Sequence, residues 1–217
     1  MNYSEPCQYS TRLVEKLELL DTETTLDFDL IHKAIYWAKK YHDGQFRKSG
    51  KPFYTHPLEV AYVVSEYKLK TDVVVTAILH DVVEDSEATV GMIVDAFSWR
   101  IAEMVDRLTR DRPDGSKLSV EEILNNAYEK DDKDVLLIKC VDRLHNMQTI
   151  GSMCNEKRKK IANQTLESVI YFSDNVDLEN LLNIISSNIT FPENVNFLKR
   201  LYSKRFSSDN YQLPSLE

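Results

Sequence analysis

Apolar side chains recur at intervals of three and four residues along most of this chain, which is the spacing of one face of an α-helix. The pattern is clear over residues 30–41 and returns at 58–67, 89–108 and 134–148. The chain also has only five glycines and six prolines in 217 residues, too few for the many tight turns of a β-sandwich. We therefore predict an all-α fold.

Two other segments lie between these predicted helices. The run "VVVTAILHDVVED" (73–85) is rich in β-branched residues and would suit a buried strand, but its length favours a buried helix that Thr71 or Asp72 caps. Residues 41–57 contain two glycines and two prolines and are predicted to form a loop, with a new helix beginning at Thr55 or His56. Ser119 and Glu122 have the form of a capping box that opens a later helix.

We expect a single domain, because the chain shows no internal repeat and no convincing linker. Its core is predicted to span about 28–175. Further helices are expected near 156–173, 178–187 and 193–204, so that residues 176–217 form a helical C-terminal extension and a frayed tail.

The net charge of −8 argues against nucleic acid or an anionic membrane as the main partner, although a local cluster of cations could still bind a small anion. No stretch approaches the roughly 18 apolar residues that cross a bilayer, and no secretory leader is visible. Cys7, Cys140 and Cys154 are odd in number and lack the spacing of a metal site. We expect a cytoplasmic protein with free thiols, and a homo-oligomer is compatible with the sequence.

Four ionisable residues follow the apolar run "VVVTAIL": His80 and Asp81, and then Glu84 and Asp85 one helical turn later. Imidazole and carboxylate ligands together suit a divalent ion such as Mn²⁺, Fe²⁺ or Zn²⁺. Two carboxylates beside a metal suit water activation and protonation of a leaving group. On local grounds alone, a satisfied histidine and a solvated acidic helix end are the simpler interpretation.

Asp142 lies on an apolar helical stripe. Val135 and Ile138 precede it at helical spacing, and Asn146 and Thr149 continue the stripe beyond it. A charge on an apolar face needs strong compensation. An arginine partner at the helix edge and a functional site both satisfy that need, and this helix alone leaves both interpretations open.

The loop "FRKSGKP" contains the cations Arg47, Lys48 and Lys51 around Ser49. In an acidic protein, a compact cationic loop suits a phosphate or the face of a purine, although solvated loop lysines are the ordinary alternative. His56 follows this loop closely and is uninformative by itself.

The conjunction of these pieces is far more specific than any one of them. The segments "AIYWAKKYHDGQFRKSGKPFYTHPLEVA", "TAILHDVVEDSEATVGMIVDAFSWRIAEMVDRLTR" and "DVLLIKCVDRLHNMQTI" cover roughly residues 30–150. Together they resemble the HD-domain hydrolase part of the RelA/SpoT-type alarmone enzymes. Given its length, the chain is similar to the free-standing small alarmone hydrolases. Nothing after residue 155 resembles the synthetase or regulatory regions of the long members.

The resemblance implies an HD-type helical bundle and a role for each matched residue. One Mn²⁺ ion would be held by four ligands: His56, His80, Asp81 and Asp142. The catalytic acidic pair would be Glu84 and Asp85. The nucleotide would be bound at its guanine end by Arg47, Lys48 and Ser49, and elsewhere by Asn146 and Thr149.

The implied activity is removal of pyrophosphate from the 3′ position of ppGpp or pppGpp, which yields GDP or GTP. Relatives that lack a synthetase domain also act on other phosphorylated nucleotides, NADPH among them, so a phosphatase of different specificity is an alternative. A non-catalytic nucleotide-sensing or protein-binding module is another. Degenerate members lose the HD or ED residues, and all of them are present here, which favours an active enzyme.

Overall fold

The computed structural model describes residues 2–47 and 49–146. The chain divides into two compact units, Met1–His145 and Asn146–Glu217, and all described residues except Asn146 belong to the first unit. The described residues form nine helices: α1 (Gln8–Leu20), α2 (Phe28–Tyr41), α3 (Thr55–Val64), α4 (Thr71–Leu79), α5 (Val82–Asp85), α6 (Val90–Ala96), α7 (Trp99–Leu108), α8 (Val120–Glu129) and α9 (Lys133–Asn146). Strand-like pairing among these described residues is limited to two isolated β-bridges. The predicted all-α class is confirmed.

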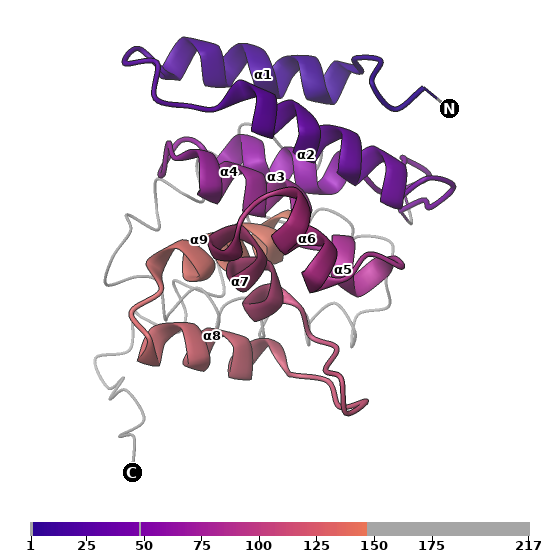
Figure 1. The fold of residues 1–217 in the computed structure, drawn as a ribbon, viewed down its shortest axis with the longest axis vertical. Coiled ribbons are helices and arrows are strands. Elements are labelled where there is room, and N and C mark those ends of the chain that lie inside the picture. Colours follow the sequence, from indigo (N-terminus) through magenta and orange to yellow (C-terminus); the bar gives the residue numbers. More distant parts are fainter. Residues whose placement is uncertain (1, 48, 147–217) are drawn as a thin grey trace, which may run out of the picture. The chain divides into compact units, whose positions relative to one another are not determined.

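Helix α4 lies at the centre of this unit and packs against α2, α3 and α7 (Figure 1). Every residue from Val73 to Leu79 is buried and all of them except Thr76 are apolar, so this part of α4 presents no face to solvent. A helix that is apolar all round is stable only when other helices enclose it. Helix α1 covers α3, and Leu13 and Leu17 are fully buried.

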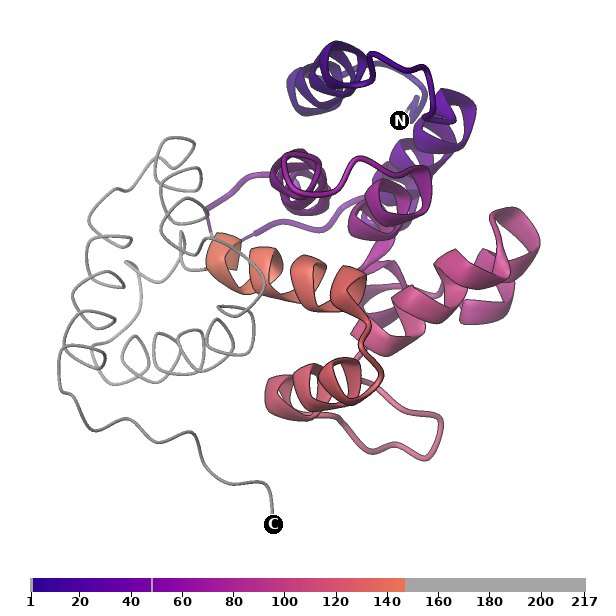
Figure 2. The same cartoon turned by 90° about the vertical axis from the view of Figure 1, so that its left-hand side faces the viewer.

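Helix α9 lies between the α3–α4 pair and α8 in both views (Figures 1 and 2). Its residues from Val135 to Asp142 are all buried, including the two charged ones, Lys139 and Asp142. The side chain of Asp132 caps the start of α9, where its Oδ1 accepts a hydrogen bond from the Val135 amide at 3.3 Å, and it forms ion pairs with Arg100 and Arg107. These contacts tie α9 to α7.

Several predicted boundaries are confirmed. Helix α3 begins at Thr55, and the Ser119–Glu122 capping box opens α8 with both of its hydrogen bonds formed. Helix α9 begins within a residue of its predicted start. The expected helix over 58–67 ends earlier, at Val64. Helix α1 lies ahead of the predicted core and was not anticipated.

Two predicted continuous helices are broken. The helix expected over 89–108 divides at Phe97, the residue that follows the last turn of α6. The Phe97 ring packs edge-on against Trp37, with ring centroids 5.1 Å apart. Ser98 then caps α7 by accepting a hydrogen bond from the Ile101 amide. The element expected over 73–85 divides at His80 and Asp81, which form a turn between α4 and the four-residue α5.

The remaining predictions concern residues outside the described part of the chain: the three helices near 156–173, 178–187 and 193–204, the boundary at about 175, Cys154, Lys48 and Thr149. Within the described part, the helices lack the length and apolar character that crossing a membrane requires.

Candidate active site

Four predicted metal ligands converge from three parts of the fold. His56 lies in the first turn of α3, His80 and Asp81 form the turn between α4 and α5, and Asp142 lies on α9. The break at His80 matters here, because Asp81 does not use its side chain to cap α5. That carboxylate instead faces the two histidines.

The distances within this metal cluster (His56, His80, Asp81 and Asp142) are short. His56 Nε2 lies 3.1 Å from Asp142 Oδ1 and 3.5 Å from Asp81 Oδ2. His80 Nε2 lies 3.2 Å from Asp81 Oδ1 and 3.7 Å from Asp142 Oδ1. One ligand atom each from His56, His80 and Asp142 fits within 4.8 Å of the other two, an arrangement that could hold a metal ion.

His80 supplies the clearest sign that the cluster suits a cation. Its Nδ1 lies 2.8 Å from the Ala77 carbonyl oxygen, which can only accept, so Nδ1 carries a proton. Its Nε2 is buried without a hydrogen-bond partner and faces carboxylate oxygens. An imidazole lone pair against carboxylates requires a positive charge between them, and metal-bound histidines characteristically donate their other N–H to a carbonyl.

In the absence of a metal, a proton supplies that charge. Burial acts to lower the pKa of His80, but the carboxylates of Asp81 and Asp142 outweigh it and raise the pKa to about 9. The protonated imidazole therefore occupies the electrostatic role that a divalent ion would take, and metal binding would release this proton.

Asp142 is held by a cation that the sequence interpretation did not include. Lys139 lies one turn earlier on α9, and its Nζ is 3.2 Å from Asp142 Oδ2. Burial acts to raise the pKa of Asp142, but the charge of Lys139 and the close contacts with His56 and His80 lower it well below its usual range. Because Lys139 contacts Oδ2, Oδ1 is the oxygen that faces both histidines.

His145 is a second residue that sequence reasoning missed. It lies one turn after Asp142 on α9, and its Nδ1 is 2.7 Å from His56 Nδ1. Burial, and then the proximity of His56, lower the pKa of His145 well below its usual value, so the ring is neutral. Lys139, Asp142 and His145 are spaced three residues apart, and this spacing was the available signal.

The acidic pair lies on α5, directly after the metal cluster. Glu84 Oε2 accepts a hydrogen bond from the Arg110 amide at 3.1 Å, which ties α5 to the loop after α7. Asp85 is exposed at the end of α5. Partial burial of its carboxyl, and then the charges of Asp81 and Glu84, raise the pKa of Asp85 to about 6.

The cationic loop between α2 and α3 is partly described. Its tight turn is closed by hydrogen bonds between Arg47 and both Lys51 and Gly50, and Gly50 adopts a φ of +80° that favours glycine. Burial lowers the pKa of Arg47, and the charges of Asp81 and Asp142 oppose that shift, so the guanidinium lies within electrostatic range of the metal cluster. Ser49 is exposed.

Gln45, in the same loop, links two elements of the site. Its Oε1 lies 2.9 Å from His42 Nδ1, and its Nε2 donates to the Asp85 carbonyl at 2.6 Å. The end of α2 is thereby joined to the end of α5. Asn146 is the last described residue of α9, next to His145. The structure therefore brings together the four predicted ligands, and Lys48 and Thr149 lie outside its description.

The chain matches a protein-family model described as an HD domain over residues 34–171, more than half of its length. It is 40% identical over 149 residues to a GTP pyrophosphokinase from Myxococcus xanthus, which is 65% of this chain and 20% of that protein. It is 36% identical over 144 residues to the bifunctional (p)ppGpp synthase/hydrolase SpoT of Escherichia coli K12, or 63% of this chain and 20% of that protein.

A guanosine-3′,5′-bis(diphosphate) 3′-pyrophosphohydrolase from Haemophilus influenzae is 34% identical over 174 residues, covering 76% of this chain and 25% of that protein. The chain thus spans about a fifth to a quarter of the length of these curated relatives. A solved structure of a metazoan ortholog of SpoT that hydrolyzes ppGpp aligns with a TM-score of 0.51 at 18% identity, over 91% of this chain and 97% of that one, and shows a shared fold. The resemblance that the motifs indicated is confirmed by these matches.

Proposed function

Because this chain belongs to the HD-domain family, we propose that it hydrolyses the 3′-pyrophosphate of ppGpp and pppGpp to give GDP or GTP and pyrophosphate. The observation that carries this proposal is the convergence of His56, His80, Asp81 and Asp142, with His80 Nε2 buried and without a hydrogen-bond partner. Relatives named as 3′-pyrophosphohydrolases supply the substrate class. The activity is assigned to a core of about 28–175, a choice that the family match over 34–171 supports.

The same four residues are proposed to hold one Mn²⁺ ion. Two imidazoles and two carboxylates form a mixed nitrogen and oxygen ligand set, which suits Mn²⁺ and other borderline divalent ions. Such an ion supplies Lewis acidity, which polarises a phosphoryl oxygen and lowers the pKa of a coordinated water. The chain's own residues supply the remaining requirements.

Glu84, together with Asp85, is proposed to orient and deprotonate the attacking water, whose oxygen joins the pyrophosphate, and to protonate the ribose 3′ oxygen that leaves with GDP or GTP. Both lie on α5 immediately after the metal cluster, and the hydrogen bond from the Arg110 amide restrains one Glu84 oxygen. A carboxyl whose pKa is about 6, as for Asp85, exchanges protons near neutral pH.

The nucleotide is proposed to bind through the cationic loop and the end of α9. Arg47, which lies within electrostatic range of the metal cluster, would bind near the guanine base with Lys48 and Ser49, and Asn146 and Thr149 would contact the nucleotide from α9 and beyond. The proposed location is the cytoplasm, a reducing compartment that agrees with the free thiol of Cys7.

The direct test is to incubate the purified full chain, with Mn²⁺, with ppGpp, pppGpp and NADPH, and to identify the product as pyrophosphate or phosphate. Release of pyrophosphate from ppGpp supports the proposal. Faster release of phosphate from NADPH would replace it with a phosphatase of different specificity. Tight binding of ppGpp without turnover would indicate a nucleotide-sensing module.

The role of the acidic pair is tested by Glu84→Gln. The amide keeps the size of the side chain and an acceptor for the Arg110 amide, but it cannot take up a proton. We expect Mn²⁺ and ppGpp binding close to wild type and loss of hydrolysis. Hydrolysis by Glu84→Gln at a near-normal rate would remove Glu84 from the mechanism.

A further inference from the structure

One close contact at the metal cluster has no part in the proposed reaction. The Nδ1 atoms of His56 and His145 lie 2.7 Å apart, and the two rings are tilted by 42° with centroids 4.7 Å apart. At this distance the two nitrogens share a hydrogen, so one of them donates and the other accepts. Which one donates determines the tautomer of both rings.

The two possible arrangements have opposite consequences for His56. If His145 donates, a neutral His56 carries its proton on Nε2, and this N–H points at Asp142 Oδ1, 3.1 Å away. His56 then has no lone pair for a cation. If His56 donates from Nδ1, the Nε2 lone pair faces the cluster, where Asp81 Oδ2 and Asp142 Oδ1 also lie.

We propose that His145 is a positioning residue of the metal centre, which accepts a hydrogen bond from His56 Nδ1–H and so keeps the Nε2 lone pair of His56 available to the ion. The inference rests on the proposed function, because it needs the metal ligands assigned there. It adds a residue that contacts a ligand rather than the ion or the nucleotide.

The position of His145 on α9 allows one helix to act on two of the proposed ligands. Asp142 and His145 lie one helical turn apart, and His56 contacts both of them, through Nε2 and Nδ1 respectively. A single helix therefore supplies one ligand directly and orients a second ligand from α3. The Nε2 lone pair of His80 is kept available in a different way, because His80 Nδ1–H donates to the Ala77 carbonyl of its own helix.

The inference predicts that metal affinity depends on a hydrogen-bond acceptor at the position of His145 Nδ1. His145→Leu and His145→Asn are matched in size, but only asparagine offers an oxygen close to the Nδ1 position. Loss of an outer hydrogen-bond partner typically weakens metal binding about 10- to 100-fold. We therefore expect that loss for His145→Leu and near wild-type affinity for His145→Asn.

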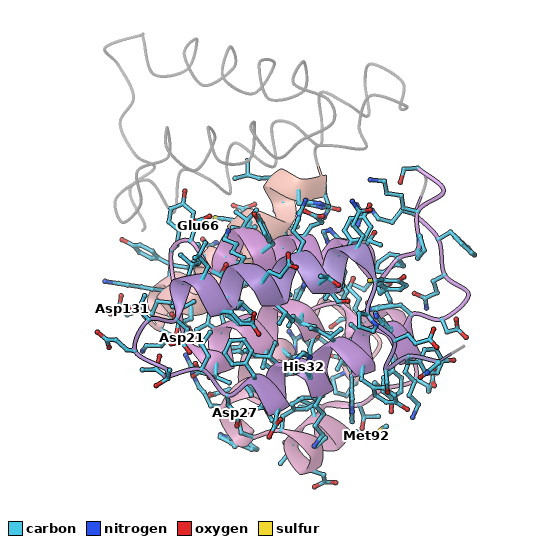
Figure 3. The ribbon with its side chains drawn as sticks, turned by 90° about the horizontal axis from the view of Figure 1, so that it is seen from above. Asp21, Asp27, His32, Glu66, Met92 and Asp131 are labelled. Atoms are coloured by element: carbon cyan, nitrogen blue, oxygen red, sulfur yellow. The ribbon has the colours of Figure 1, made fainter. Side chains whose placement is uncertain are left out.

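The measurement is Mn²⁺ binding to the chelator-stripped full chain without nucleotide, by titration calorimetry or by the electron paramagnetic resonance signal of free Mn²⁺. His32→Leu is the control, since His32 is exposed on α2 (Figure 3), and its affinity should equal that of wild type. Thermal unfolding in chelator checks that each variant is folded. If His145→Leu is not, His145→Met replaces it, because methionine adapts to irregular surroundings and is also apolar.

Recovery of affinity in His145→Asn relative to the apolar variant supports the inference. Equal affinity of wild type and the apolar variant overturns it, and so does equal weakening of the asparagine and apolar variants, which would indicate packing rather than hydrogen bonding. Failure of the wild-type chain to bind any divalent ion has a different meaning, because it overturns the proposed metal centre itself.

Discussion

The body of α4 and its C-terminal end are equally buried but chemically opposite. Val73 to Leu79 are apolar except for Thr76 and are enclosed by other helices, whereas His80 is just as buried and faces carboxylates. Burial of the apolar part stabilises the fold at roughly 25 cal/mol per Å². Burial of ionisable groups costs free energy unless a counter-charge is present. Stability and chemistry are therefore divided between two adjacent segments of one chain.

Asp81→Ala gives the strongest test of this division. Removing a proposed ligand should abolish both Mn²⁺ retention and ppGpp hydrolysis, while the apolar body of α4 is unchanged. Calorimetric titration with Mn²⁺ and a pyrophosphate-release assay measure the loss, and urea unfolding in chelator measures stability. Full activity in Asp81→Ala would contradict the ligand assignment, and unfolding of the variant would contradict the division.

Ile78→Ala tests the opposite half. Ile78 is completely buried in α4, so its truncation leaves a cavity and should lower the free energy of unfolding by about 2–5 kcal/mol. The folded fraction should keep its metal affinity. Urea denaturation provides the measurement, and Leu19→Ala, at a residue 79% exposed on α1, is the control that should change little.

The pH dependence of the metal-free protein sharpens the comparison. The pKa of His80 is raised from 6.5 to about 9 on folding. Its contribution to the free energy of unfolding is therefore fully present below pH 6.5 and is lost as the pH rises through 9. The loss is on the order of 3 kcal/mol. The pKa values of His56 and His145 are lowered, so these two groups titrate below pH 6.5 and do not offset the loss of stability between pH 6.5 and 9.

Urea midpoints measured in chelator between pH 6 and pH 9 test this expectation. The decline should be absent from His80→Gln and should be reduced when a divalent ion replaces the proton. A midpoint that stays constant in the metal-free wild-type chain would show that the carboxylates do not hold a proton on His80.

Ser119→Ala should have the smallest effect. Ser119 and Glu122 satisfy exposed backbone amides at the start of α8, and loss of such a cap typically costs about 1 kcal/mol. Metal affinity and hydrolysis should be unchanged, because this polar pair serves the helix alone. Thermal unfolding and the same activity assay check both expectations, and a loss of activity would link α8 to the site.

Much of the helical framework could be predicted from local pattern. The apolar spacing of residues 30–41, the proline after His56 and the capping box at Ser119 each act within one or two helical turns, where backbone geometry determines the outcome. The breaks at Phe97 and His80 could not be predicted in this way. At Phe97 the helix ends and the ring contacts Trp37, which lies far away in the sequence.

The same contrast separates the metal cluster from its support. The residue types of His56, His80, Asp81 and Asp142 in their motif contexts indicated a divalent metal site through the resemblance to the HD-domain hydrolases, although local pattern alone favoured a satisfied histidine and a solvated helix end. The sequence by itself therefore determined the helical class and the chemistry available. Only the tertiary structure decided that Lys139 pairs with one Asp142 oxygen and that His145 contacts His56, because both contacts depend on tenths of an ångström and the second joins atoms of two different helices.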